Sequence, residues 1–105
     1  MTYRVVMMPR AENDLGRIFE YMRARAPRAA EEWLNRAMRS IESLAHHPGR
    51  CPLAPESASF DEPIRELFFG AGNRGTYRFL FAVVNETVYV LHVRHGSMLP
   101  LTPDE

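Results

Sequence analysis

The hydrophobic pattern near the amino end changes its period at a proline. Tyr3 to Met8 is a short run of aromatic and aliphatic residues, typical of a β-strand, and Pro9 ends it. After Pro9, apolar residues recur at steps of three and four, which predicts a helix that extends to about Ala26. Glu12 and Asp14, in its first turns, are interpreted as complementing the helix dipole. The apolar face consists of Ala11, Leu15, Ile18, Phe19, Met22 and Ala26.

A second helix is predicted from Pro27, which interrupts the first helix and suits the first turn of the next. Because the break is so short, we expect an antiparallel helix hairpin that packs on a sheet, with Trp33 in the core. The helix closes at His46-His47-Pro48-Gly49. Its apolar stripe consists of Ala30, Trp33, Leu34, Ala37, Met38, Ile41, Leu44 and Ala45.

The rest of the chain predicts a loop and three strands. Arg50 to Glu62 contains prolines and small polar residues and is interpreted as an irregular surface loop. Turns are expected at Gly70 to Gly75 and at Asn85-Glu86, and Met98 to Pro103 is too rich in proline for a stable helix. Apolar, β-branched and aromatic runs predict strands at Ile64 to Phe69, Thr76 to Val84 and Val88 to Arg94.

The order β-α-α-β-β-β defines the fold class as α+β. At 105 residues the chain is expected to form a single domain, residues 1–105. Its content of 46% hydrophobic and 25% charged residues is that of an ordinary globular protein. No apolar run approaches the roughly 20 residues of a membrane-spanning helix, and the amino end shows no signal peptide, so we expect a cytoplasmic protein.

The basic residues are all arginines, and 13 of them balance 13 acidic residues. The absence of lysine excludes a lysine-based catalytic mechanism. The charge balance argues against broad nonspecific binding of nucleic acid, although a local patch of arginines can hold phosphates. Cys51 is the only cysteine, so no internal disulfide can form. The spacing of His46, His47, Cys51 and His92 matches no common zinc pattern, and we expect neither a metal nor a cofactor.

Motifs of a known family follow one another along almost the whole chain. The first helix opens with Ala-Glu-Asn-Asp-Leu (11–15), and the second ends in leucine, a short spacer and Pro48. The strands contain Ile-Arg-Glu-Leu (64–67), Tyr-Arg-Phe-Leu-Phe (77–81) and Val-Leu-His-Val-Arg-His-Gly (90–96). In this order and spacing they resemble the RelE/ParE family of type II toxin–antitoxin systems, among them ParE-like plasmid stabilisation proteins.

That resemblance implies a helix hairpin packed on a mostly antiparallel four-stranded sheet. It also implies a cognate antitoxin whose disordered tail folds over the exposed edge of the sheet and the groove beside the helices. Free toxin would then arrest growth: RelE-like members cleave ribosome-bound mRNA, whereas ParE-like members poison DNA gyrase. A homodimer or a toxin–antitoxin hetero-oligomer is expected, because the surface that the antitoxin covers must otherwise face water or a second copy.

Metal-independent cleavage of RNA needs a base, an acid and cations around the scissile phosphate. Arg65, Arg78 and His95 are the best available catalytic set, and Arg78 and Arg94 the best phosphate-binding pair. In alternating strands Arg65 and Arg78 can project from one face of the sheet, where Arg94 or His95 would join them, depending on the register. Relatives that use a glutamate and a histidine point to Glu66 with His95.

Each candidate also has a structural interpretation. Arg78 can hold a buried carboxylate or backbone carbonyls, and Arg65 can form an ion pair with a nearby glutamate. His95, near a strand end, can be a partly exposed polar residue, and His92 is the histidine expected to face the core.

We favour the ParE-like function, inhibition of DNA gyrase through protein binding. The lysines and the carboxyl-terminal tyrosine of the ribonucleolytic members are missing, since Tyr89 is the last tyrosine. The alternative is a ribosome-dependent mRNA endonuclease that uses Arg65, Arg78 and His95. A third hypothesis is an inert homologue that only binds its antitoxin, because Ser97-Met98-Leu99 stands where many members continue with arginines.

Overall fold

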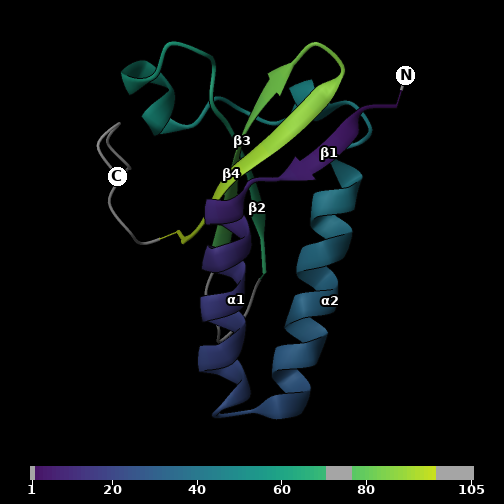
Figure 1. The fold of residues 1–105 in the computed structure, drawn as a ribbon, viewed down its shortest axis with the longest axis vertical. Helices are drawn as coiled ribbons and strands as arrows, with labels where there is room; N and C mark the ends of the chain where they lie inside the picture. The colour runs from purple at the N-terminus through teal and green to yellow at the C-terminus, as the bar shows by residue number, and fades with distance from the viewer. Residues whose placement is uncertain (1, 71–76, 97–105) are drawn as a thin grey trace.

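The helices and strands follow the predicted order. A computed structural model describes residues 2–70 and 77–96 (Figure 1). Thr76, most of the turn expected at Gly70 to Gly75, and the tail expected at Met98 to Pro103 lie outside the described residues. The elements are β1 (Arg4–Met7), α1 (Pro9–Arg23), α2 (Pro27–Ser43), the short 3-10 helices η1 (Pro48–Arg50) and η2 (Pro55–Ser59), β2 (Arg65–Phe69), β3 (Tyr77–Val84) and β4 (Thr87–His95).

Both α-helices begin at a proline, as their sequences predict. Pro9 and Pro27 lie in the first turns of α1 and α2, where the missing N–H of proline has no intrahelical acceptor to lose. The two helices run antiparallel, side by side (Figure 1). Trp33 of α2 is 1% exposed, which confirms its place in the core. Neither of these helices has the length and apolar character needed to cross a membrane.

The four strands form one mixed sheet, in the order β1-β4-β3-β2. β1 pairs with β4 in parallel, whereas the β2–β3 and β3–β4 pairs are antiparallel. This arrangement confirms the α+β fold with a helix hairpin on a mostly antiparallel sheet. A register shift occurs where Leu80 pairs with His92 but Phe81 pairs with Val90, so Leu91 is an extra residue in β4.

The two faces of the sheet have separate apolar clusters. On the helix side, Trp33 packs against Phe69 with ring centroids 5.6 Å apart, and Phe69 stacks on Phe79 at 4.3 Å. On the other side lies a smaller cluster of Ala54, Ile64, Leu80 and Ala82, with Phe60 and Leu91 beside it. The segment between α2 and β2 therefore covers the second face of the sheet.

Part of that segment departs from its prediction as an irregular surface loop. Arg50 to Glu62 contains the whole of the short helix η2, and Cys51, Ala54 and Glu56 are all buried. A charged residue such as Glu56 is buried only when a partner compensates for its lost hydration. The interpretation was wrong because the sequence of this segment does not show such a partner.

Candidate functional site

Arg78 lies in the interior of the protein. Both faces of β3 are covered, and Arg78 is only 4% exposed. A guanidinium keeps its charge even when it is buried, because its pKa lies far above neutrality. Burial therefore requires acceptors that replace the lost water.

Glu56 and Glu66 provide those acceptors. Nη1 and Nη2 of Arg78 donate to Oε1 and Oε2 of Glu56 at 2.8 and 2.6 Å. Nη1 also donates to Oε1 of Glu66 at 3.1 Å. The paired contact with Glu56 uses the planar fork of the guanidinium, which matches the geometry of a carboxylate. Glu56 belongs to η2, Glu66 to β2 and Arg78 to β3, so this Arg78 cluster joins three segments of the chain.

The Arg78 cluster is poorly suited to bind a further anion. One guanidinium faces two carboxyl groups whose side chains are 0% and 11% exposed. The hydrogen bonds with Glu56 raise the pKa of Arg78, and burial opposes that effect. A phosphate at this position would have to displace a carboxylate and would then lie beside negative charge. The geometry fits the structural interpretation of Arg78.

Arg65 projects from the opposite face of the sheet. In β2, Arg65 pairs with Phe81, which belongs to the helix-side core, whereas its neighbour Glu66 bonds to Arg78. Because adjacent side chains of a strand alternate between faces, the expectation that Arg65 and Arg78 share one face is wrong. Nη1 of Arg65 instead donates to the carbonyl oxygen of Cys51 at 2.7 Å.

The register of β4 separates its two candidates. Arg94 lies opposite Arg78, and His95 lies opposite Tyr77, so only Arg94 shares the face of Arg78. The ring of His95 packs edge-on against Tyr77, with centroids 5.1 Å apart.

The proposed catalytic residues do not converge. Arg65 pairs with Phe81 on one side of β3 and His95 pairs with Tyr77 on the other. Four residues of a strand span about 13 Å, so Arg65 and His95 are separated along β3 as well as across it. Arg78 lies on the other face of the sheet, and the structure therefore does not assemble Arg65, Arg78 and His95 into one site.

A basic cavity brings Arg94 and His95 together with residues of α1. Its volume is about 310 Å³, and its lining includes three arginines and one carboxylate. Sequence reasoning did not select Arg10 and Arg17, although their spacing of seven places them on one face of a helix. The lining residues are Arg10, Asp14, Arg17, Ile18, Tyr77, Val93, Arg94 and His95.

Asp14 links α1 to β4 instead of only complementing the helix dipole. Its Oδ2 accepts a hydrogen bond from the backbone N–H of Val93 at 3.2 Å and lies 3.6 Å from Nδ1 of His92. β1 pairs with β4 only as far as Val90. Beyond Val90, Asp14 provides the hydrogen-bond acceptor on the side of β4 that faces away from β3. The side chain of His92 is 15% exposed, and burial lowers its pKa, an effect that Asp14 opposes.

Metal binding has no support in the described part of the chain. Residues 2–70 and 77–96 contain no group of three or more His, Cys, Asp or Glu side chains that could hold an ion.

Two solved structures are similar to this α+β fold. One is described as the chromosomal ParDE toxin–antitoxin system from P. aeruginosa, with 15% identity and a TM-score of 0.70, covering 90% of this chain and 96% of that chain. The other is the toxin–antitoxin complex RelBE2 from Mycobacterium tuberculosis, with 26% identity and a TM-score of 0.52, covering 90% and 99%. No curated protein matches the chain at a significant level.

The fold thus defines a small toxin domain of the ParE/RelE type. A family model described as the ParE toxin of the type II toxin–antitoxin system, parDE, matches residues 5–100. The chain belongs to this ParE toxin family.

Proposed function

We propose that this toxin inhibits growth by binding DNA gyrase, and that a cognate antitoxin neutralises it in the cytoplasm. The observation that carries the proposal is the engagement of Arg78 by Glu56 and Glu66. Cleavage of RNA at this face would need a free cation for the phosphate, whereas inhibition by contact needs no such group. The separation of Arg65 from His95 supports the same choice.

The proposal of an antitoxin partner rests on the similar structures. Both are described as toxin–antitoxin systems or complexes. Because an antitoxin covers surface that the free toxin exposes, the hetero-oligomer is proposed as the resting form of the protein.

The proposal is tested with purified toxin and DNA gyrase. We expect the toxin to block supercoiling and to raise the amount of gyrase-cleaved DNA, with no loss of mRNA in a parallel translation reaction. In cells, inducible expression of the toxin alone should provoke the DNA-damage response while transcripts stay intact. Normal supercoiling at a large molar excess of toxin would contradict the proposal, and unaffected growth would favour the inert homologue.

Cleavage of ribosome-bound mRNA without a metal is the second candidate function. The basic cavity favours it, because Arg94 and His95 lie there with Arg10 and Arg17. If the protein were this endonuclease, transcript cleavage would fall at least tenfold in Arg17→Ala and His95→Gln variants. Arg28→Ala, which changes an exposed arginine at the start of α2, is the matched control and should keep full activity.

A further inference from the structure

Cations line the side of α1 that faces the end of β4. Arg10 and Arg17 are seven residues apart, which places them on one side of a helix. Both line the basic cavity, whose lining also includes Arg94 and His95 of β4. Arg17 is exposed, and it has no hydrogen bond or ion pair with another residue in 2–70 or 77–96. Its charge is therefore available to a partner outside the chain.

The line of cations continues past the cavity to the end of α1. Tyr21 lies four residues after Arg17, so it belongs to the same side of the helix. Tyr21 is 63% exposed, and Cζ of Arg25 lies over its ring, 3.6 Å from the centroid. At 1.5 Å per residue, Arg10 and Tyr21 are about 16 Å apart along the helix. We call this surface the basic face; it consists of Arg10, Arg17, Tyr21, Arg25, Arg94 and His95.

The carboxylate in the described lining of the cavity is already paired. Oδ1 of Asp14 accepts a hydrogen bond from Nε of Arg10 at 3.1 Å, and Oδ2 accepts from the N–H of Val93 at 3.2 Å. Asp14 thus holds Arg10 in place while the terminal nitrogens of that guanidinium have no partner among residues 2–70 and 77–96. Three arginines against one carboxylate leave the lining with an excess of two positive charges.

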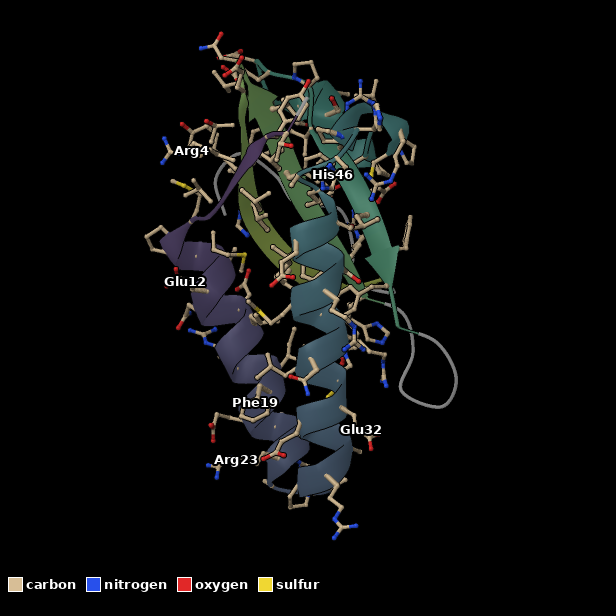
Figure 2. All side chains as sticks on the ribbon, turned by 90° about the vertical axis from the view of Figure 1, so that its right-hand side faces the viewer. Arg4, Glu12, Phe19, Arg23, Glu32 and His46 are labelled. Carbon is tan, nitrogen blue, oxygen red and sulfur yellow. The ribbon has the colours of Figure 1, made fainter. Side chains whose placement is uncertain are left out.

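Other acidic residues of α1 do not cancel this excess. Glu20 accepts a hydrogen bond from Nη2 of Arg23 at 2.8 Å. Glu12 is two residues from Arg10 and therefore about 200° away around the helix axis. Figure 2 shows Glu12 in line with Phe19 and Arg23, along a different side of α1 from the basic face. A net charge of zero for the whole chain thus coexists with a local excess of positive charge.

We propose that the basic face binds the phosphate backbone of the DNA that gyrase holds, so that the toxin contacts the DNA as well as the enzyme. This inference rests on the proposed inhibition of gyrase. The guanidinium groups of Arg10 and Arg17 donate to phosphate oxygens, and Arg25 adds a cation at the far end of the face. Contacts with phosphates carry no sequence information, so the binding does not depend on the sequence of the DNA.

The length of the basic face selects a polyanion over a small anion. Arg10 and Arg17 are about 10 Å apart along α1, too far for one phosphate group to bond to both. A DNA duplex presents one negative charge per about 1.7 Å of its axis, so several phosphates lie within reach of the face. Because each contact releases condensed counterions, the affinity must fall as salt is added.

The first experiment measures binding of the purified toxin alone to a fluorescein-labelled DNA duplex of about 20 base pairs, which is longer than the basic face. Fluorescence anisotropy should give a Kd of about 100 μM or tighter at low ionic strength, and the same value for a duplex of unrelated sequence. The logarithm of the association constant should fall linearly with the logarithm of the salt concentration. Absence of binding at low ionic strength would overturn the proposal.

Substitutions of single arginines locate the contact. Arg17→Gln should weaken binding and reduce the salt slope by about one, because one phosphate contact is lost. Arg17→Lys keeps the charge and should keep the slope. The matched control is Arg39→Gln, which removes the same charge from an exposed position beside β2, at the other edge of the sheet. Equal slopes for Arg17→Gln and Arg39→Gln would contradict binding at the basic face.

A supercoiling assay separates this proposal from the proposed function. Arg17→Gln should need about threefold or more toxin than Arg39→Gln to inhibit gyrase by half, since it loses a contact with the DNA. If the native toxin inhibits gyrase but does not bind the duplex, the DNA contact is wrong and the proposed function stands. If the toxin binds the duplex and supercoiling stays normal, the proposed function is wrong, and the link to gyrase fails with it.

Two further polyanions test the choice of DNA. A single-stranded RNA of the same length and a polyglutamate peptide of similar charge compete with the labelled duplex. We expect both to compete more weakly than unlabelled duplex, because fewer counterions are released from a single strand or a peptide than from a duplex. Stronger competition by the RNA would assign the basic face to RNA, and equal competition by polyglutamate would show a general anion surface; either result would overturn the proposal.

Discussion

Glu56 and Arg78 are 22 residues apart in the chain, yet Oε1 and Oε2 of the carboxylate each accept one hydrogen bond, from Nη1 and Nη2 of the guanidinium respectively. The contact is buried, and it fixes η2 against β3 on the face of the sheet opposite the helices. A segment with the composition of a loop is thereby part of the folded core.

Replacing Arg78 by alanine should lower the free energy of unfolding by about 3–5 kcal/mol, because two buried carboxyl groups lose their cation. Urea denaturation followed by the fluorescence of Trp33, the only tryptophan, measures the change. The matched control is Arg65→Ala, which loses one hydrogen bond to a carbonyl and should lower it by about 1–2 kcal/mol. Equal losses in the two variants would contradict the difference in burial and pairing.

Replacing the whole Arg78 cluster by apolar residues should be far less damaging than removing Arg78 alone. The variant Glu56→Leu/Glu66→Leu/Arg78→Met leaves no buried charge without a partner, so most of the lost stability should return. If this triple variant also kept its toxicity, the three charges would have no direct part in function.

The stability of the protein should depend on the protonation of His92. In the unfolded chain its pKa is near the ordinary value of 6.5, whereas burial lowers it in the fold; Asp14 opposes this effect, and Arg10 and Arg94 reinforce it. At a pH between the two pKa values, the unfolded state binds more protons than the folded state. The contribution of neutral His92 to the free energy of unfolding is therefore complete above about pH 6.5 and is lost as the pH falls through the folded-state pKa. Urea denaturation from about pH 7 to pH 5 should therefore show a steeper loss for the native protein than for His92→Gln. Parallel curves would show that His92 is not responsible.

The backbone at His47 should favour glycine. His47 has a φ of 47°, in the left-handed region that strains residues with a Cβ. His47→Gly should raise the free energy of unfolding by about 0.5–1 kcal/mol, because relief of the strain exceeds the added entropy of the unfolded chain. Asn85→Gly, at a φ of 56°, should give a smaller gain, since asparagine tolerates this region. Thermal unfolding tests both, and a lower Tm for His47→Gly would refute the argument.

The thiol of Cys51 should react slowly in the folded protein. Its residue is 4% exposed, and burial raises the pKa of the thiol, with Arg50 and Arg65 opposing the effect. Modification by an aromatic disulfide reagent should be about a hundredfold or more slower than in denaturant, because the reactive thiolate is scarce and shielded. Equal rates in the folded and unfolded protein would show that the segment opens freely.

The local parts of the fold were predictable, because their signals lie within a few neighbouring residues. Pro9 and Pro27 mark the starts of both helices, and the apolar periods between and after them mark the buried faces. β3 was predicted in the same way from its continuous apolar run. Each of these patterns can be interpreted without knowing which distant residues the element contacts.

The candidate site was less predictable, because its geometry depends on pairing between distant segments. Nothing next to Glu56 indicates that Arg78 will cover it. The side of the sheet that Arg65 occupies depends on the register between β2 and β3, which neither strand shows alone. Arg10 and Arg17 were visible as one face of a helix, but only the packing of α1 on β4 brings them to Arg94.

The hydrogen bond between Asp14 and Val93 restricts the length of the chain as well as its residues. Only Met8 separates β1 from α1, so the rotation of the helix about its axis is set by the number of residues before Asp14. One inserted residue would turn this face by about 100° and carry the carboxylate away from β4. Relatives that retain this hydrogen bond should therefore have their insertions and deletions elsewhere in the chain, and none between β1 and the residue that corresponds to Asp14.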